Sequence, residues 1–145
     1  MVTVIPKYII LHHSLTKDSG TVSWGAIRGY HVGVLGWRDI GYHVGVERIG
    51  DDYEILLGRM LNVPGAHTRG MNHVSIGVCF MGNFDLAPPS PELWEKGITV
   101  VKWIREVFSI PINHVQGHRD YASYKSCPGK KFNVSQFKKD LLSRT

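Results

Sequence analysis

Residues 7–14 read Lys-Tyr-Ile-Ile-Leu-His-His-Ser. The first five of them, residues 7–11, are short, apolar and partly β-branched, which is typical of a buried strand. His12 and His13 follow at the carboxyl end of this strand, and the alternation of side chains along a strand directs the two imidazoles to opposite faces of a sheet. The stretch therefore predicts a buried strand that presents a single histidine to a site on one face.

Strand-like and helix-like segments follow one another along the rest of the chain. The turn at 50–52 separates two strand-like segments and predicts a hairpin. Ser90 and Pro91 combine a capping hydroxyl with a proline at the first helical position, so a helix is expected to begin there. We expect strands at 42–49, 53–57, 74–81 and 113–116, and helices over 24–34 after a cap at Ser23, over 91–108, and after a cap at Ser135. This order predicts an α/β fold, a single domain over residues 1–145 with a central mixed β-sheet flanked by helices.

Composition and charge narrow the class of protein. Of the 145 residues 43% are hydrophobic and 20% are charged, which excludes a disordered chain. No apolar run approaches the roughly 20 residues needed to span a bilayer, so no membrane insertion is expected. Residues 1–7 lack a basic region, so the sequence predicts no signal peptide and a cytoplasmic location. The net charge of +5 favours an anionic partner. The lysines form no stripe interleaved with aromatic residues, so nucleic acid is not expected as that partner.

A second polar segment contains a histidine and a cysteine at a useful spacing. His118 follows the predicted strand at 113–116, and Cys127 lies nine positions later in a loop. One imidazole and one thiolate can share a tetrahedral Zn²⁺ ion, which accepts nitrogen and sulfur ligands. Two ligands do not hold a catalytic zinc, so His12 or His13 is the candidate for the third. The alternative is that Cys127 is a buried thiol that packs as a small apolar side chain, as we expect for Cys79.

Five segments, taken in order, resemble those of a known family. They are Tyr8–Ser14, Trp37–His43, Gly65–Asn72 with Ser75–Val78 and Met81–Phe84, Gly117–Asp120, and Cys127–Gly129. Together they resemble the zinc-dependent N-acetylmuramoyl-L-alanine amidases of the phage T7 lysozyme and peptidoglycan-recognition-protein type, over nearly the whole chain. The resemblance implies the amidase-type α/β fold and His12, His118 and Cys127 as the zinc ligands.

The resemblance also assigns roles around the metal. It implies Tyr42 and Lys125 as catalytic residues, with Lys125 two positions before the cysteine as in the phage enzymes. The Lys125 ammonium can stabilise the oxyanion, while Tyr42 can orient or deprotonate the attacking water or hydrogen-bond the oxyanion, and the two roles stay open at this point. His67, Thr68 and Asn72 lie in a long loop over 58–72, and we expect them to contact substrate because loops carry binding residues.

The function implied is hydrolysis of the amide bond between N-acetylmuramic acid and L-alanine in peptidoglycan, by a zinc-activated water. We expect a monomeric phage or prophage endolysin that reaches the cell wall through a membrane pore; cytoplasmic peptidoglycan recycling is the competing role. Two alternatives belong to other classes: a module that binds peptidoglycan without cleaving it, and a regulator of a phage RNA polymerase.

Overall fold

The computed structural model describes residues 3–15 and 24–144, and five strands of this part form one sheet in the order β3-β2-β4-β1-β5. The strands are β1 (Tyr8–His13), β2 (Val44–Ile49), β3 (Asp52–Leu57), β4 (Ser75–Phe80) and β5 (Val115–Gly117), and the helices are α1 (Trp24–Gly29), α2 (Pro91–Phe108) and α3 (Val134–Ser143). β1 pairs in parallel with β4 and β5, β2 pairs in parallel with β4, and β3 is antiparallel to β2. The predicted α/β fold with a mixed sheet is confirmed.

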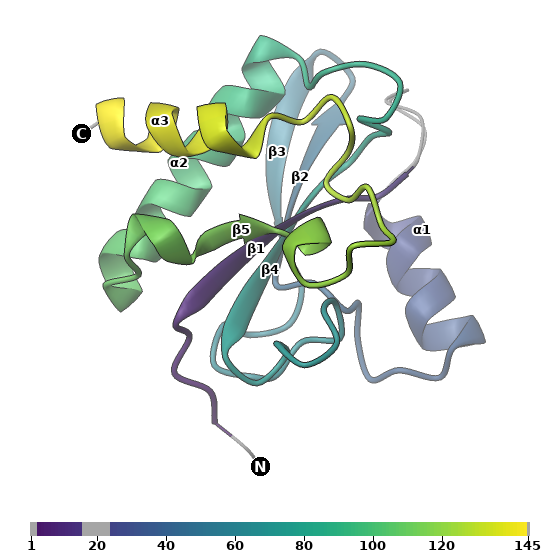
Figure 1. Ribbon diagram of the computed structural model, residues 1–145. Helices are drawn as coiled ribbons and strands as arrows, with labels where there is room; N and C mark the ends of the chain where they lie inside the picture. Colours follow the sequence, from purple (N-terminus) through teal and green to yellow (C-terminus); the bar gives the residue numbers. More distant parts are fainter. Residues whose placement is uncertain (1–2, 16–23, 145) are drawn as a thin grey trace.

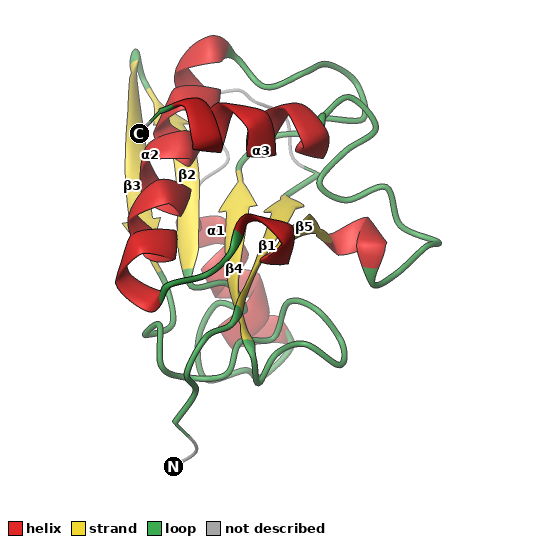
Figure 2. Ribbon diagram, turned by 60° about the vertical axis from the view of Figure 1, so that its left-hand side comes forward, coloured by secondary structure: helices red, strands yellow, loops and turns green. Residues whose placement is uncertain are grey.

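A separate apolar cluster packs against each face of the sheet. Ile9 and Leu11 point into the larger core, which α2 and α3 cover. His12 lies opposite Cys79 in the parallel pairing of β1 with β4, so both side chains project from the other face. There Cys79 packs in a smaller apolar cluster with Trp24, at the start of α1. Figure 1 and Figure 2 show α2 and α3 together on one side of the sheet and α1 on the other.

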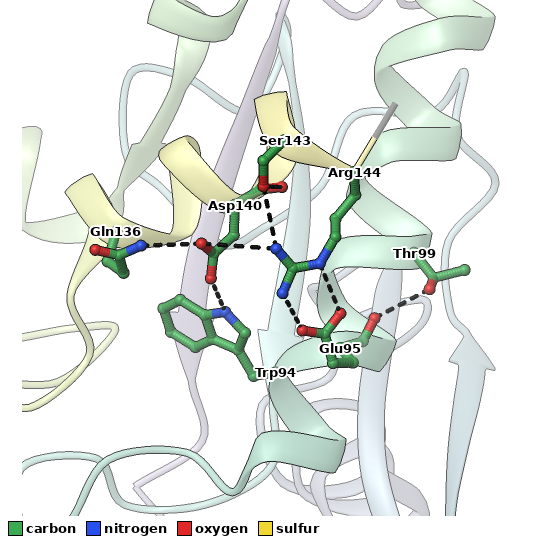
Figure 3. Close-up of polar contacts among 7 residues, drawn as sticks. All are labelled: Trp94, Glu95, Thr99, Gln136, Asp140, Ser143 and Arg144. Atoms are coloured by element: carbon green, nitrogen blue, oxygen red, sulfur yellow. Dashed lines mark hydrogen bonds and ion pairs between the residues drawn. The ribbon is translucent and has the colours of Figure 1, made fainter.

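Helix α2 has the boundaries that its sequence predicts. The Ser90 side chain accepts a hydrogen bond from the backbone N–H of Leu93, and Pro91 occupies the first turn. Helix α3 is tied to α2 by a polar cluster, in which the Trp94 indole donates to Asp140 at 2.8 Å and the Arg144 guanidinium pairs with Glu95 (Figure 3). The two helices therefore cover the larger core as a connected pair.

Several predicted boundaries differ from the structure. The cap of α3 is Asn133, whose side chain accepts from the N–H of Gln136, and not Ser135, which lies inside the helix. Tyr42 comes before β2 rather than within it. The predicted helix over 24–34 is α1 followed by a π-helical turn at Tyr30–Val34, and its predicted cap, Ser23, lies outside the described residues. Among the helices described, none has the length and apolar character that a bilayer crossing requires.

Candidate metal centre and active site

Three side chains converge at the carboxyl ends of neighbouring strands. His12 is next to last in β1, His118 directly follows β5, and Cys127 lies in the loop beyond. Because β1 and β5 are parallel and adjacent, their carboxyl ends lie at the same edge of the sheet. One ligand atom from each of the three residues lies within 4.8 Å of the others, and His12 Nδ1 is 3.6 Å from the Cys127 sulfur. The fold thus gathers two imidazoles and one thiol around a single point.

The strand alternation selects His12 over His13. His13 projects to the opposite face, where its Nδ1 accepts a hydrogen bond from the backbone N–H of Phe84 at 3.1 Å. Its own backbone N–H donates to the Cys127 sulfur at 3.4 Å. His13 therefore contacts the cluster through its main chain, while its side chain lies on the opposite side of the sheet.

Burial sets the protonation states of the three donors. It lowers the pKa of His118 to about 4, with help from the positive charge of Lys125, and lowers the pKa of His12 well below its ordinary value. Both imidazoles are therefore neutral near pH 7, the form that binds a metal. Burial raises the pKa of the Cys127 thiol to about 11, although the His13 N–H and the Lys125 charge oppose this shift. Two neutral imidazoles and a thiol of this spacing fit the ligand set of a catalytic Zn²⁺ with one open position.

The loop that presents Cys127 is held by two residues that the sequence analysis missed. The Arg119 guanidinium donates to the backbone carbonyls of Ser126, Gly129 and Phe132 at 3.1, 2.7 and 2.9 Å. Asp85 accepts from the Ser126 hydroxyl at 2.9 Å on the other side. The position of Arg119 next to His118 was the only hint in the sequence of this role. The backbone carbonyl groups that Arg119 binds cannot be identified from a sequence pattern.

The cluster opens into a cavity of about 410 Å³. Tyr42 and Lys125, the two predicted catalytic residues, line it together with all three metal-ligand candidates. The remaining lining residues are His13, Ser14, Leu15, His31, Trp37, Ala66, His67, Asp85, Tyr124 and Ser126. A substrate in this cavity would lie against the metal-ligand cluster and both predicted catalytic side chains.

Tyr42 is held as a neutral phenol. Its ring centroid lies 5.1 Å from that of His12, and burial, reinforced by the thiols of Cys79 and Cys127, raises its pKa well above 10. A phenol with a raised pKa keeps its proton at pH 7 and can donate a hydrogen bond. Cys79 is fully buried, as its sequence context predicts.

The loop with the predicted substrate contacts lies beside His12. His67 lines the cavity, while Thr68 is only 2% exposed. The Asn72 side chain accepts from the backbone N–H groups of His67 and Thr68 at 2.9 and 3.0 Å, so it shapes the loop. No bound molecule tests these three residues, and their role as substrate contacts stays a prediction.

The fold and the cluster together define a class of protein. It is the class of enzymes with an α/β fold in which three side chains at one edge of the sheet can hold a metal ion beside a substrate cavity.

Comparison with known proteins gives the family within that class. The family model of N-acetylmuramoyl-L-alanine amidases matches residues 3–130, and the chain belongs to this family. Peptidoglycan-recognition protein SC1a of Drosophila melanogaster is 30% identical over 136 residues, which cover 85% of this chain and 68% of that protein. The endolysin of Escherichia phage T7 is 42% identical over 77 residues, 53% of this chain and 48% of the endolysin.

Solved structures share the whole architecture. The N-acetylmuramoyl-L-alanine amidase LysC from Clostridium intestinale has a TM-score of 0.83 at 26% identity, covering 95% of this chain and 86% of that one. Drosophila PGRP-LB has a TM-score of 0.73 at 27% identity, covering 87% and 76%. The matched segment spans 44% of peptidoglycan-recognition protein SC2 from Drosophila, about half the length of that relative, as for the T7 endolysin.

Proposed function

We propose that this protein is a zinc-dependent amidase that cleaves the bond between N-acetylmuramic acid and L-alanine in peptidoglycan. The observation that carries the proposal is the placement of the His12, His118 and Cys127 donor atoms within 4.8 Å of one another on a cavity lined by Tyr42 and Lys125. Membership of the amidase family supports the same reaction.

Zn²⁺ held by His12, His118 and Cys127 would supply Lewis acidity, which polarises a carbonyl and lowers the pKa of a bound water toward 7. The exposed Lys125 ammonium lines the cavity and is free to approach the scissile carbonyl oxygen, where negative charge develops. A donor of this kind contributes about 3–4 kcal/mol to the stability of the transition state. In this proposal the Tyr42 phenol, which lines the cavity, donates a hydrogen bond to a substrate oxygen.

The cavity walls offer the surfaces on which a sugar and a peptide can lie. The His31 and Trp37 rings pack together with centroids 4.5 Å apart on one wall, and both line the cavity. Of the loop with His67, Thr68 and Asn72, His67 lines the cavity, and in our proposal this side chain faces the substrate. The net charge of +5 favours approach to an anionic cell wall.

We propose a lytic role in a phage or prophage, with the protein acting as a monomer. The similarity to the endolysins of phages T7 and T3 and to a Clostridium endolysin supports this role over peptidoglycan recycling.

Mass analysis of the products released from purified peptidoglycan tests the reaction. We expect peptides with a free L-alanine amino group, no new reducing ends, and loss of all release with a chelator. Lys125→Ala is expected to retain zinc and lose about 10²–10³-fold in turnover, because one donor to the oxyanion is removed. Cys127→Ser is expected to lose the metal.

Lys131→Ala is the matched control, since Lys131 is an exposed lysine that does not line the cavity. Turnover by Lys125→Ala at the parent rate would refute the catalytic assignment. Binding to cell walls without release of amino groups would show a recognition module instead of an enzyme.

A further inference from the structure

A buried chain of polar side chains continues behind the metal-ligand candidate His12. His12 Nε2 lies 2.9 Å from Nδ1 of His67, and the Thr68 hydroxyl lies 2.9 Å from that His67 nitrogen and 3.3 Å from His12 Nε2. The other nitrogen of His67 lies 3.3 Å from the Ser75 hydroxyl, which donates to the backbone carbonyl of Met71 at 2.6 Å. His67, Thr68 and Ser75 are each no more than 9% exposed, so the chain is shielded from solvent.

Metal binding through Nδ1 of His12 determines where the protons of this chain lie. His12 faces the Cys127 sulfur with Nδ1, so Nδ1 is the atom that must be unprotonated to bind a metal. The single proton of a neutral His12 is then on Nε2, which donates to His67 Nδ1. His67 must therefore carry its own proton on Nε2, where the Ser75 oxygen accepts it. Ser75 can accept because its hydroxyl hydrogen is directed at the Met71 carbonyl.

We propose that His67 is a positioning residue for the metal: it accepts the Nε2 proton of His12 and thereby holds the His12 ring with Nδ1 directed at the ion. The inference rests on the zinc centre proposed above and adds to it a group that acts through His12. Hydrogen bonds of this kind fix the tautomer and orientation of a ligating histidine, and their loss costs about 10–100-fold in metal affinity.

Two glycines make room for the His67 ring. A Cβ atom on Gly77, in β4, would lie 2.6 Å from Cγ of His67, and one on Gly65 would lie 2.5 Å from Cδ2. Both distances are far below van der Waals contact, so any side chain at either position displaces the imidazole. Two separate positions of the fold therefore lack a side chain where the His67 ring approaches His12. This supports a specific role for the position of the His67 ring.

A residue that only touches substrate would behave differently. Its loss would raise KM and leave the affinity for zinc unchanged, whereas loss of a positioning residue lowers zinc affinity in the absence of any substrate. Measurement of zinc affinity by competition with a chromophoric chelator separates the two roles and does not depend on turnover.

The test compares His67→Phe with His67→Asn. Phenylalanine fills the space but has no acceptor, and we expect zinc affinity to fall about 10–100-fold. Asparagine places a carbonyl oxygen near the position of Nδ1, and we expect the zinc affinity of His67→Asn to stay within a few fold of the parent value. His73→Phe is the matched control, because His73 is exposed and outside the cluster. Thermal unfolding in excess chelator shows whether each variant is folded.

Gly77→Ala provides a second, independent variant. It removes no polar group of the chain but displaces the His67 ring, so it is expected to weaken zinc binding as His67→Phe does. Parent-like zinc affinity in a folded His67→Phe variant would overturn the positioning role and leave the zinc centre standing. A parent protein that binds no zinc would overturn both proposals.

Discussion

Among His12, His118 and Cys127, only Cys127 must lose a proton from its donor atom to bind a metal at neutral pH. Burial raises its pKa to about 11, while the pKa of His118 is lowered to about 4 and that of His12 also lies well below its ordinary value. A metal that binds the three side chains must therefore displace one proton, from the thiol, and none from the imidazoles.

This difference predicts the pH dependence of zinc binding. Between about pH 5 and about pH 6.5 we expect the affinity to rise tenfold per pH unit, because in this range, below the pKa of a zinc-bound water, binding releases only the thiol proton. Chelator competition at several pH values gives the slope, and calorimetry in buffers of different ionisation enthalpy counts the protons. An affinity that does not change over this range would mean that Cys127 is already a thiolate in the metal-free protein.

At the scale of elements, helix α2 lies close to the sheet at one glycine. A Cβ atom on Gly97 would lie 2.2 Å from Cε1 of Phe80, the last residue of β4. Phe80 is fully buried and packs between the tilted ring of Phe132 and the edge-on ring of Phe137, so it has little freedom to move. The approach of α2 to the sheet therefore depends on the missing side chain.

Gly97→Ala tests this contact against helix propensity. Alanine favours a helix by about 1 kcal/mol over glycine, but overpacking a core costs about 1–3 kcal/mol. We expect the clash to dominate and the free energy of unfolding to fall, as measured by chemical denaturation. Gly29→Ala in α1 is the matched control, since no atom lies within 4 Å of its Cβ position, and it is expected to be neutral or stabilising. A higher free energy of unfolding for Gly97→Ala would show that the Phe80 ring can move to make room for the added methyl group.

At the scale of the whole molecule, the fold buries several histidines in neutral form. Burial lowers the pKa of His67 to about 3 and that of His43 below its ordinary value, with further lowering from neighbouring positive groups. In the unfolded chain the histidines bind a proton below about pH 6.5, whereas in the folded state the buried histidines stay neutral to a lower pH. Folding stability is then complete above about pH 6.5 and declines as the pH falls toward 3.

The metal-free protein should therefore be acid-sensitive. In excess chelator we expect the free energy of unfolding to fall by about 1.4 kcal/mol per pH unit for His67 alone below about pH 6. Denaturant titrations at several pH values measure the slope. His67→Asn should give a shallower slope, while His73→Asn should leave it unchanged. Equal slopes for the parent and His67→Asn would contradict a neutral, buried His67.

Local signals in the chain were enough for most of the elements. Helix α2 has the predicted bounds because a capping serine and a proline act within one turn. The cap of α3 was misplaced by two residues, since Asn133 and Ser135 are both good caps and packing of Phe137 and Leu141 selects between them.

The order of strands and helices, and the location of His12 and His118 at the carboxyl ends of strands, follow from the sequence because apolar periodicity and capping are short-range properties. The pairing of β1 with both β4 and β5 does not follow from it, and this pairing places His12 beside His118. The hydrogen-bonded chain through His67 and Ser75, and the arginine that holds the Cys127 loop, likewise exist only once the chain is folded. The contact between His12 and His67 joins residues 55 positions apart, and the Arg119 contacts depend on backbone carbonyls whose direction no residue type encodes.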